Sequence, residues 1–322
     1  MGVDFALRTW QAWLWCGCGS ILFVVSLYLV PARLRMLPRS NPSQIKARLA
    51  AVSCTTVMAV VATAVLARPV EHGQPFQRWI GVHTQHLGVA LVLPVLLTCC
   101  LFLGPLVTMA WMCKTLIQNE VSAFGVARRR AHPLPWHAVI RRELVGKTNL
   151  SNGRYGAIRN LVVGPIAEEV VFRGCSVPVL LGAGISRTQI IWLSPLMFGF
   201  AHLHHALEWL RQGHDVRAVV AGVVLQIAYT SVFGAFAVFV QLRTGHLVSS
   251  ILVHILCNFM GLPDLTFSIA PGDFRRSSPT SVLYNHRIGI WSCYVLGIYL
   301  FFLLLFPLSS PNLYGSSLWL IK

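Results

Sequence analysis

Residues 166–173 read IAEEVVFR, which places two adjacent carboxylates (Glu168, Glu169) and one guanidinium (Arg173) inside an otherwise apolar run. This run belongs to an apolar segment at about residues 155–181, which is long enough to cross the ~30 Å hydrocarbon core of a bilayer. On insertion scales, one charge at the centre of a bilayer costs about 2.5–3.5 kcal/mol. Three charges in one span therefore need partners or a chemical task.

The whole chain has the composition of an integral membrane protein. Its 322 residues are 55% hydrophobic and 11% charged, whereas soluble domains carry about 25% charged residues. We predict an all-α fold, a polytopic transmembrane helical bundle of about eight spans, forming a single membrane domain over residues 1–322. The predicted spans are residues 13–30, 49–67, 87–112, 155–181, 188–203, 218–242, 247–262 and 288–308. Pro94 and Pro105 predict kinks in the third of them.

Three regions are expected to differ in role. We predict a catalytic core at about residues 155–265, N-terminal spans within 13–112, and a basic cytosolic loop at 114–154, where 136–145 has the pattern of an interfacial helix. The loop after the first span has five basic residues and no acid, and residues 114–159 have nine bases and two acids. Basic loops remain on the cytosolic side, so both termini are expected in the lumen.

The net charge of +16 favours some partners over others. Basic residues in short loops beside spans are typical of contact with anionic membrane lipid, so no nucleic-acid partner is predicted. The nine cysteines include no C-x-x-C pair, which argues against a disulfide framework or a structural zinc module. No cofactor is predicted.

Spacing divides the charges of the opening stretch. Glu169 and Arg173 are four residues apart, so they share a helix face and can form an ion pair. Glu168 lies about 100° around the helix from Glu169 and is not held by that arginine. It is therefore the better candidate for a general base.

Two further spans carry polar groups at apolar depth. His254 and Asn258 are four residues apart and point to one side of their span, which suits a pair of donors to an oxyanion. His202 lies near the end of another span, where it can share a water molecule with Glu168. A carboxylate, an imidazole and two opposing donors together indicate peptide hydrolysis without a serine or cysteine nucleophile. His204 and His205 are expected at the interface, and the loop residue His246 is expected in solvent.

Two other functions fit the same residues. Glu168, His202 and His254 would make a three-ligand catalytic zinc site, although no H-E-x-x-H motif is present. Buried Glu and His side chains also form proton relays in proton-coupled transporters. Repeated halves and matching broken helices, which are frequent in transporters, are not visible in the sequence.

The ordered motifs resemble those of the type II CAAX prenyl endopeptidases, the Ras-converting enzyme family of glutamate intramembrane proteases. The resemblance rests on EExxxR at 168–173, FxxxH at 198–202 and HxxxN at 254–258. Longer stretches look like the eukaryotic branch: FGFAHLHHALE (198–208), YTSVFGA (229–235), RTGHL (243–247) and HILCNFMGLP (254–263). The resemblance covers about residues 155–265 and is weak over the first 110 residues.

The resemblance implies a substrate and a set of roles. The substrate is a farnesylated or geranylgeranylated CAAX protein, cut after the prenylcysteine so that the last three residues are released. Glu168 and His202 would activate water, and His254 and Asn258 would stabilise the oxyanion. Glu169 and Arg173 would support the geometry of the helix. The resemblance also implies residence in the endoplasmic reticulum membrane, with the site open to the cytosol.

Overall fold

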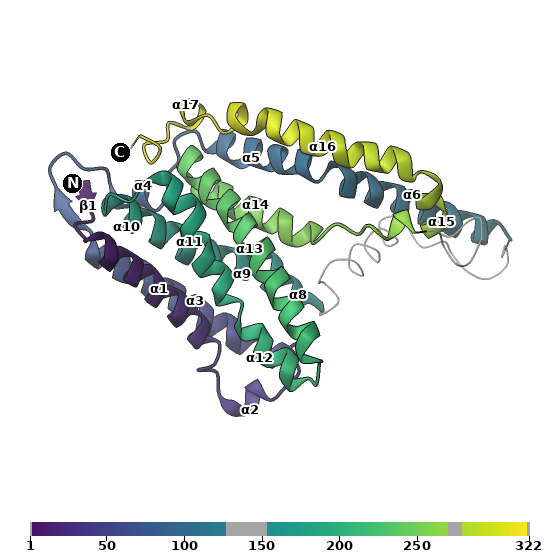
Figure 1. Cartoon of the computed structure of the whole chain (residues 1–322), viewed down its shortest axis with the longest axis horizontal. Helices are drawn as coiled ribbons and strands as arrows, with labels where there is room; N and C mark the ends of the chain where they lie inside the picture. Colours follow the sequence, from purple (N-terminus) through teal and green to yellow (C-terminus); the bar gives the residue numbers. More distant parts are fainter. Residues whose placement is uncertain (1, 127–152, 270–278, 321–322) are drawn as a thin grey trace. The chain divides into compact units, whose positions relative to one another are not determined.

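The computed structural model describes residues 2–126, 153–269 and 279–320, so the predicted interfacial helix at 136–145 and most of the predicted basic loop lie outside it. The described part is almost entirely helical, which confirms the predicted all-α class (Figure 1). Its two short strands, β1 (Gly2–Asp4) and β2 (Arg68–Val70), pair antiparallel with Val3 opposite Pro69.

The described contacts group the chain into two compact units. Unit 1 comprises residues 1–94, 158–255 and 309–322, and unit 2 comprises residues 95–157 and 256–308. Besides the strands, unit 1 contains α1 (Thr9–Ser26), α2 (Ala32–Arg35), α3 (Pro42–Leu66), α4 (Phe76–Trp79), η2 (Arg159–Val163), α9 (Gly164–Glu169), η3 (Val170–Cys175), α10 (Ser176–Gly182), α11 (Arg187–Ala201), α12 (His204–Arg211), α13 (Val216–Thr244) and α17 (Pro311–Tyr314). Unit 2 contains α6 (Leu103–Val126), η4 (Thr266–Ser268), α15 (Pro279–Asn285) and α16 (Arg287–Leu308). The boundary falls within α5 (Leu87–Leu101), α8 (Gly153–Ile158) and α14 (Leu247–Met260).

Every predicted span coincides with helical structure, but the number that crosses a membrane stays a prediction. Four helices in the described part have the length and hydropathy of a span, namely α3, the continuous α11–α12 segment, α13 and α16. The pair α5 and α6 adds a fifth if it is one span, although the two helices are bent by 79° at Phe102. The break lies between the two predicted kink sites, and Pro105 lies in the first turn of α6, where a missing N–H costs little.

Local sequence signals explain where the long helices of unit 1 begin and end. α11 begins at a capping box, in which the Ser186 hydroxyl accepts from the Gln189 N–H. The Asp215 side chain accepts from two backbone N–H groups at the start of α13. That helix ends at Gly245, whose φ of 70° lies in the left-handed region that glycine tolerates.

Helix packing in unit 1 surrounds the glutamate segment. α11 and α13 run side by side (Figure 1), and α3 and α1 also pack on the η3 segment. One buried apolar cluster encloses the glutamate segment, and its members are Phe23, Val52, Ala167, Val171, Phe172 and Phe198. In unit 2, α6 packs along α16, and Tyr294 forms part of a separate core.

Candidate active site

The two glutamates lie between two π-helical turns. α9 ends at Glu169, η2 precedes α9, and η3 follows it directly. π-turns in helices are rare and frequently occur at functional sites, because they rotate the following side chains relative to a regular α-helix. The segment 159–175 is therefore an irregular helix built around Glu168 and Glu169.

The predicted ion pair between Glu169 and Arg173 is present. Arg173 Nη1 lies 3.1 Å from Glu169 Oε1, and both side chains are almost fully buried. The guanidinium lies over two phenyl rings, 4.6 Å from the Phe198 centroid and 5.7 Å from that of Phe233. Within the described residues its N–H groups make no hydrogen bond, so the ion pair and the two rings are its polar environment.

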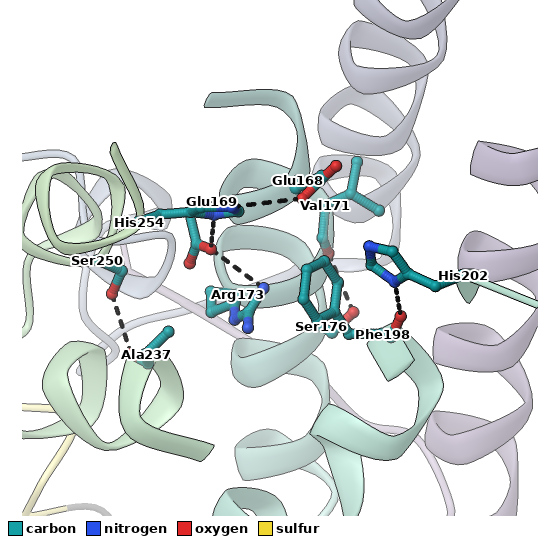
Figure 2. A network of polar contacts seen from close by, with 10 residues as sticks. All are labelled: Glu168, Glu169, Val171, Arg173, Ser176, Phe198, His202, Ala237, Ser250 and His254. Atoms are coloured by element: carbon teal, nitrogen blue, oxygen red, sulfur yellow. Dashed lines mark hydrogen bonds and ion pairs between the residues drawn. The ribbon is translucent and has the colours of Figure 1, made fainter. Parts of the chain in front are cut away.

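His254 joins the two glutamates from another helix. Its Nδ1 lies 2.7 Å from Glu169 Oε1, and its Nε2 lies 3.6 Å from Glu168 Oε2 (Figure 2). His254 is buried, and its ring packs 4.7 Å from the Phe233 ring. The contact with Glu169 was not predicted from the sequence, because it joins residues 85 positions apart.

His202 lies on the other side of the glutamate segment from His254 (Figure 2). Its Nδ1 is 2.8 Å from the Phe198 carbonyl oxygen, so Nδ1–H donates and Nε2 keeps its lone pair. His202 also interacts electrostatically with Glu168, whose side chain is 25% exposed. The less buried glutamate therefore lies near an imidazole nitrogen that can accept a proton.

Two aromatic residues that were not predicted as site residues from the sequence also belong to this arrangement. The Phe198 ring contacts Arg173 and the rings of both His202 and His254, with centroid separations of 4.9 and 6.3 Å to the histidines. Phe233 contacts Arg173 and His254 from α13. Both aromatics occur in the motif stretches, but nothing in their spacing indicated contact with the buried charges.

The remaining predicted residues have different surroundings. Asn258 lies one turn after His254 on α14 and is exposed. His204 and His205 are half-buried.

His246 was predicted to be in solvent, which is wrong, since it is fully buried. The Gln85 carbonyl oxygen accepts from its imidazole, and its ring packs 3.9 Å from that of His83.

The alternative zinc site requires Glu168, His202 and His254 to share one metal ion. Across residues 2–126, 153–269 and 279–320, no three His, Cys, Asp or Glu side chains are placed to share a metal ion. Glu168 and His254 do approach one another, at the 3.6 Å separation of Oε2 and Nε2.

The fold and the site define a multi-pass helical membrane protein that gathers two glutamates, an arginine and two histidines inside its bundle. The family model for the type II CAAX prenyl endopeptidases, described as Rce1-like, matches residues 151–260. Human CAAX prenyl protease 2 is 30% identical over 321 residues, which cover 98% of this chain and 86% of the human protein. The Arabidopsis thaliana protein of the same name is 31% identical over 320 residues, which cover 94% of this chain and 90% of the Arabidopsis protein.

A further relative is the probable CAAX prenyl protease 2 of Schizosaccharomyces pombe, 34% identical over 76% of this chain and 79% of its own length. No solved structure matches the chain significantly. The chain belongs to the type II CAAX prenyl endopeptidase family, as the three motifs predicted. This membership favours the endopeptidase over a proton-coupled transporter.

Proposed function

We propose that the chain hydrolyses the peptide bond after the prenylated cysteine of CAAX proteins and releases the C-terminal tripeptide. The observation that carries this proposal is the different environment of the two glutamates. Glu169 is fully buried against Arg173 and His254, whereas Glu168 is partly exposed and has histidines near it from two other helices. One carboxylate is thus used for structure, and the other remains available for chemistry.

Glu168 and His202 activate the attacking water in this scheme. Glu168 accepts a proton from water, and Nε2 of His202 holds the same water through its lone pair. The hydroxide then attacks the carbonyl carbon of the prenylcysteine. When the tetrahedral intermediate collapses, the C–N bond breaks and the proton passes to the nitrogen of the leaving tripeptide.

His254 and Asn258 stabilise the oxyanion of that intermediate. Glu169 accepts from Nδ1–H of His254, so the ring can donate from Nε2 only when it carries a second proton. The carboxylate of Glu169 therefore supports both the orientation of His254 and its role as a donor.

The substrate's prenyl chain explains why the site lies within a helical membrane bundle. Each buried CH₂ of a lipid anchor contributes about 0.8 kcal/mol, so the prenyl chain holds the substrate beside the spans. Water must then reach Glu168 at membrane depth, which is consistent with its partial exposure.

Cleavage of a prenylated CAAX peptide by the purified full-length chain tests the proposal. Glu168→Gln and His202→Ala are expected to lower kcat by at least about 100-fold, the usual contribution of a general base. The matched controls Glu71→Gln and His72→Ala change exposed residues of the same types and should cut like the parent. Unchanged cleavage by Glu168→Gln would refute the assignment of the base.

A chelator arm separates the metal-free scheme from the zinc alternative. The proposal expects full activity after exhaustive chelation and no stoichiometric zinc in the active protein. Loss of activity that added zinc restores would favour Glu168, His202 and His254 as ligands instead.

We also propose that the chain lies in the endoplasmic reticulum membrane with its site open to the cytosol. The basic loop between α1 and α3 supports this orientation, since basic loops remain cytosolic. An epitope inserted between α2 and α3 should be digested by protease added outside intact microsomes. Protection of that epitope would reverse the orientation.

A further inference from the structure

Three arginines of unit 1 gather around a single glutamate that is not one of the proposed catalytic residues. Arg39 Nε lies 2.8 Å from Glu208 Oε1, and Arg159 Nη1 is 3.4 Å from the Arg39 carbonyl oxygen, to which it donates. Arg48 interacts electrostatically with Glu208 and with both other arginines. These residues come from the α2–α3 loop, α3, η2 and α12, so the cluster is assembled by tertiary packing.

The cluster carries an excess of positive charge. Three guanidinium groups face one carboxylate, which leaves a formal charge of +2. Burial lowers the pKa of Arg39, Glu208 opposes this, and the charges of Arg48 and Arg159 lower it further. Nε of Arg48 is buried and makes no hydrogen bond to any residue that the structure describes. Glu208 alone thus does not neutralise the arginines, and an anionic ligand would.

The cluster is connected to the active site through His205. Nδ1 of His205 lies 3.7 Å from Glu208 Oε2, and its ring centroid is 5.9 Å from that of His202. Arg159 also lies on the same continuous helical segment as Glu168, nine residues earlier. At the 1.5 Å per residue of a regular α-helix this separation would be about 13 Å along the helix axis, and the π-helical turn of η2 makes it shorter.

This distance matches the part of the substrate that is released. The scissile bond of a CAAX protein is three residues from the C-terminal carboxylate, and three extended residues span about 10 Å. Such a carboxylate is costly in hydrocarbon, so it needs a polar or cationic site within that distance. We infer that Arg48 and Arg159 bind the C-terminal carboxylate of the CAAX substrate and thereby fix the cleavage position three residues from the end. This inference rests on the proposed function.

Paired peptides that differ only at the C-terminus test the inference. The full-length protein in phosphatidylcholine vesicles is given a farnesylated CAAX peptide as the free acid or as the C-terminal amide. We expect the parent to prefer the acid by roughly 10- to 100-fold in kcat/KM, the range of a hydrogen bond to a charged group. Arg48→Gln and Arg159→Gln should lower cleavage of the acid and leave the amide unchanged, and Arg159→Lys should restore part of the preference.

The ratio of the two peptides separates binding of the carboxylate from other roles. A variant whose defect is only poor folding loses activity on both peptides equally. Equal loss on both peptides would refute the inference. Equal cleavage of the acid and the amide by the parent would refute it as well. Arg33→Gln, an exposed arginine of α2, is the matched control and should keep the parent's ratio.

Anionic lipid is the competing ligand for the same arginines. If the effect of Arg48→Gln appears only when phosphatidylserine is added to the vesicles, and equally for both peptides, the cluster binds headgroups and the inference is wrong. Binding of both peptides to the Glu168→Gln protein gives the acid-to-amide ratio without turnover. The ratio of the two binding affinities tests the carboxylate subsite even if the parent cleaves neither peptide. Absence of cleavage by the parent would refute the proposed function but not the subsite.

Discussion

Arg173 is stabilised by very few groups for a charge that is almost fully buried. Its partners are one carboxylate oxygen of Glu169 and the faces of Phe198 and Phe233. The same oxygen accepts from His254, so removing either charge of the pair alters the hydrogen bonding of a proposed catalytic group. Breaking a buried pair from one side costs more than removing both charges, because it leaves one charge without compensation.

Arg173→Met is therefore expected to lower the free energy of unfolding by about 3–5 kcal/mol. The double variant Glu169→Gln/Arg173→Met should lose less than the sum of the two single variants. Unfolding by SDS in mixed micelles measures all four proteins of this cycle. Additive losses would mean that the two side chains do not act as a pair.

The sequence predicted local contacts of the site better than distant ones. The Glu169–Arg173 pair follows from helical spacing alone, since four residues place two side chains on one face. The bond from His254 to Glu169 depends on how α14 packs against the glutamate segment, which no spacing encodes. Likewise, burial of His246 follows from its contacts with Gln85 and His83, about 160 residues earlier in the chain.

Helix positions were predictable because hydrophobic runs and capping residues are local signals. The predicted span at 218–242 became α13 (Val216–Thr244), between the Asp215 cap and Gly245. The π-turns of η2 and η3 were not predicted. Kinks were predicted in the span at 87–112, but at Pro94 and Pro105, whereas the break lies at Phe102. The two π-turns flank α9 directly, so they affect the directions in which Glu168 and Glu169 point.

The crossing of α11 and α13 gives the second prediction. A Cβ at Gly234 would lie 2.7 Å from Pro195 Cβ and 3.2 Å from Arg173 Nη2, so glycine permits both the close approach and the position of the guanidinium. Gly234→Ala is expected to cost about 1–3 kcal/mol through overpacking and to reduce peptide cleavage. SDS unfolding and cleavage rates of the same preparation measure the two effects.

Gly19 in α1 provides the control for that substitution. A Cβ there meets no atom within 4 Å, so Gly19→Ala should be neutral, or stabilising by up to about 1 kcal/mol through helix propensity. If Gly234→Ala were as stable and active as Gly19→Ala, the close approach would not matter for the site.

At the scale of the whole molecule, His83 and His246, which lie in two loops between predicted spans, make the free energy of unfolding depend on pH. The Gln85 carbonyl oxygen accepts from Nε2–H of His246, and the Gly245 carbonyl oxygen accepts from Nε2–H of His83. The Nδ1 atoms of both rings are buried and make no hydrogen bond within the described residues, which suits neutral imidazoles with a lone pair at Nδ1. Protonation would add a donor without an acceptor to each ring and place two positive charges 3.9 Å apart, measured between ring centroids.

The pKa values agree with this neutral pair. Burial and the charge of His83 lower the pKa of His246 to about 4, and the bond to Gln85 opposes the shift. Burial, with a smaller contribution from Arg78, also lowers the pKa of His83. In the unfolded chain both histidines titrate near 6.5, so the unfolded state binds protons first as the pH falls. Stability is then complete above about pH 6.5 and decreases as the pH falls toward 4.

His246→Gln should remove much of this dependence, because an amide can donate to the Gln85 carbonyl oxygen without titrating. The thermal unfolding midpoint of the parent in detergent, followed by tryptophan fluorescence, is expected to fall between pH 6.5 and 5. The variant should show a shallower fall over the same interval, whereas the exposed-residue control His214→Gln should follow the parent. Parallel curves for parent and His246→Gln would mean that other groups, such as carboxylates in ion pairs, set the acid sensitivity. A shallower curve would assign it to a buried contact between two inter-span loops, outside the proposed catalytic residues.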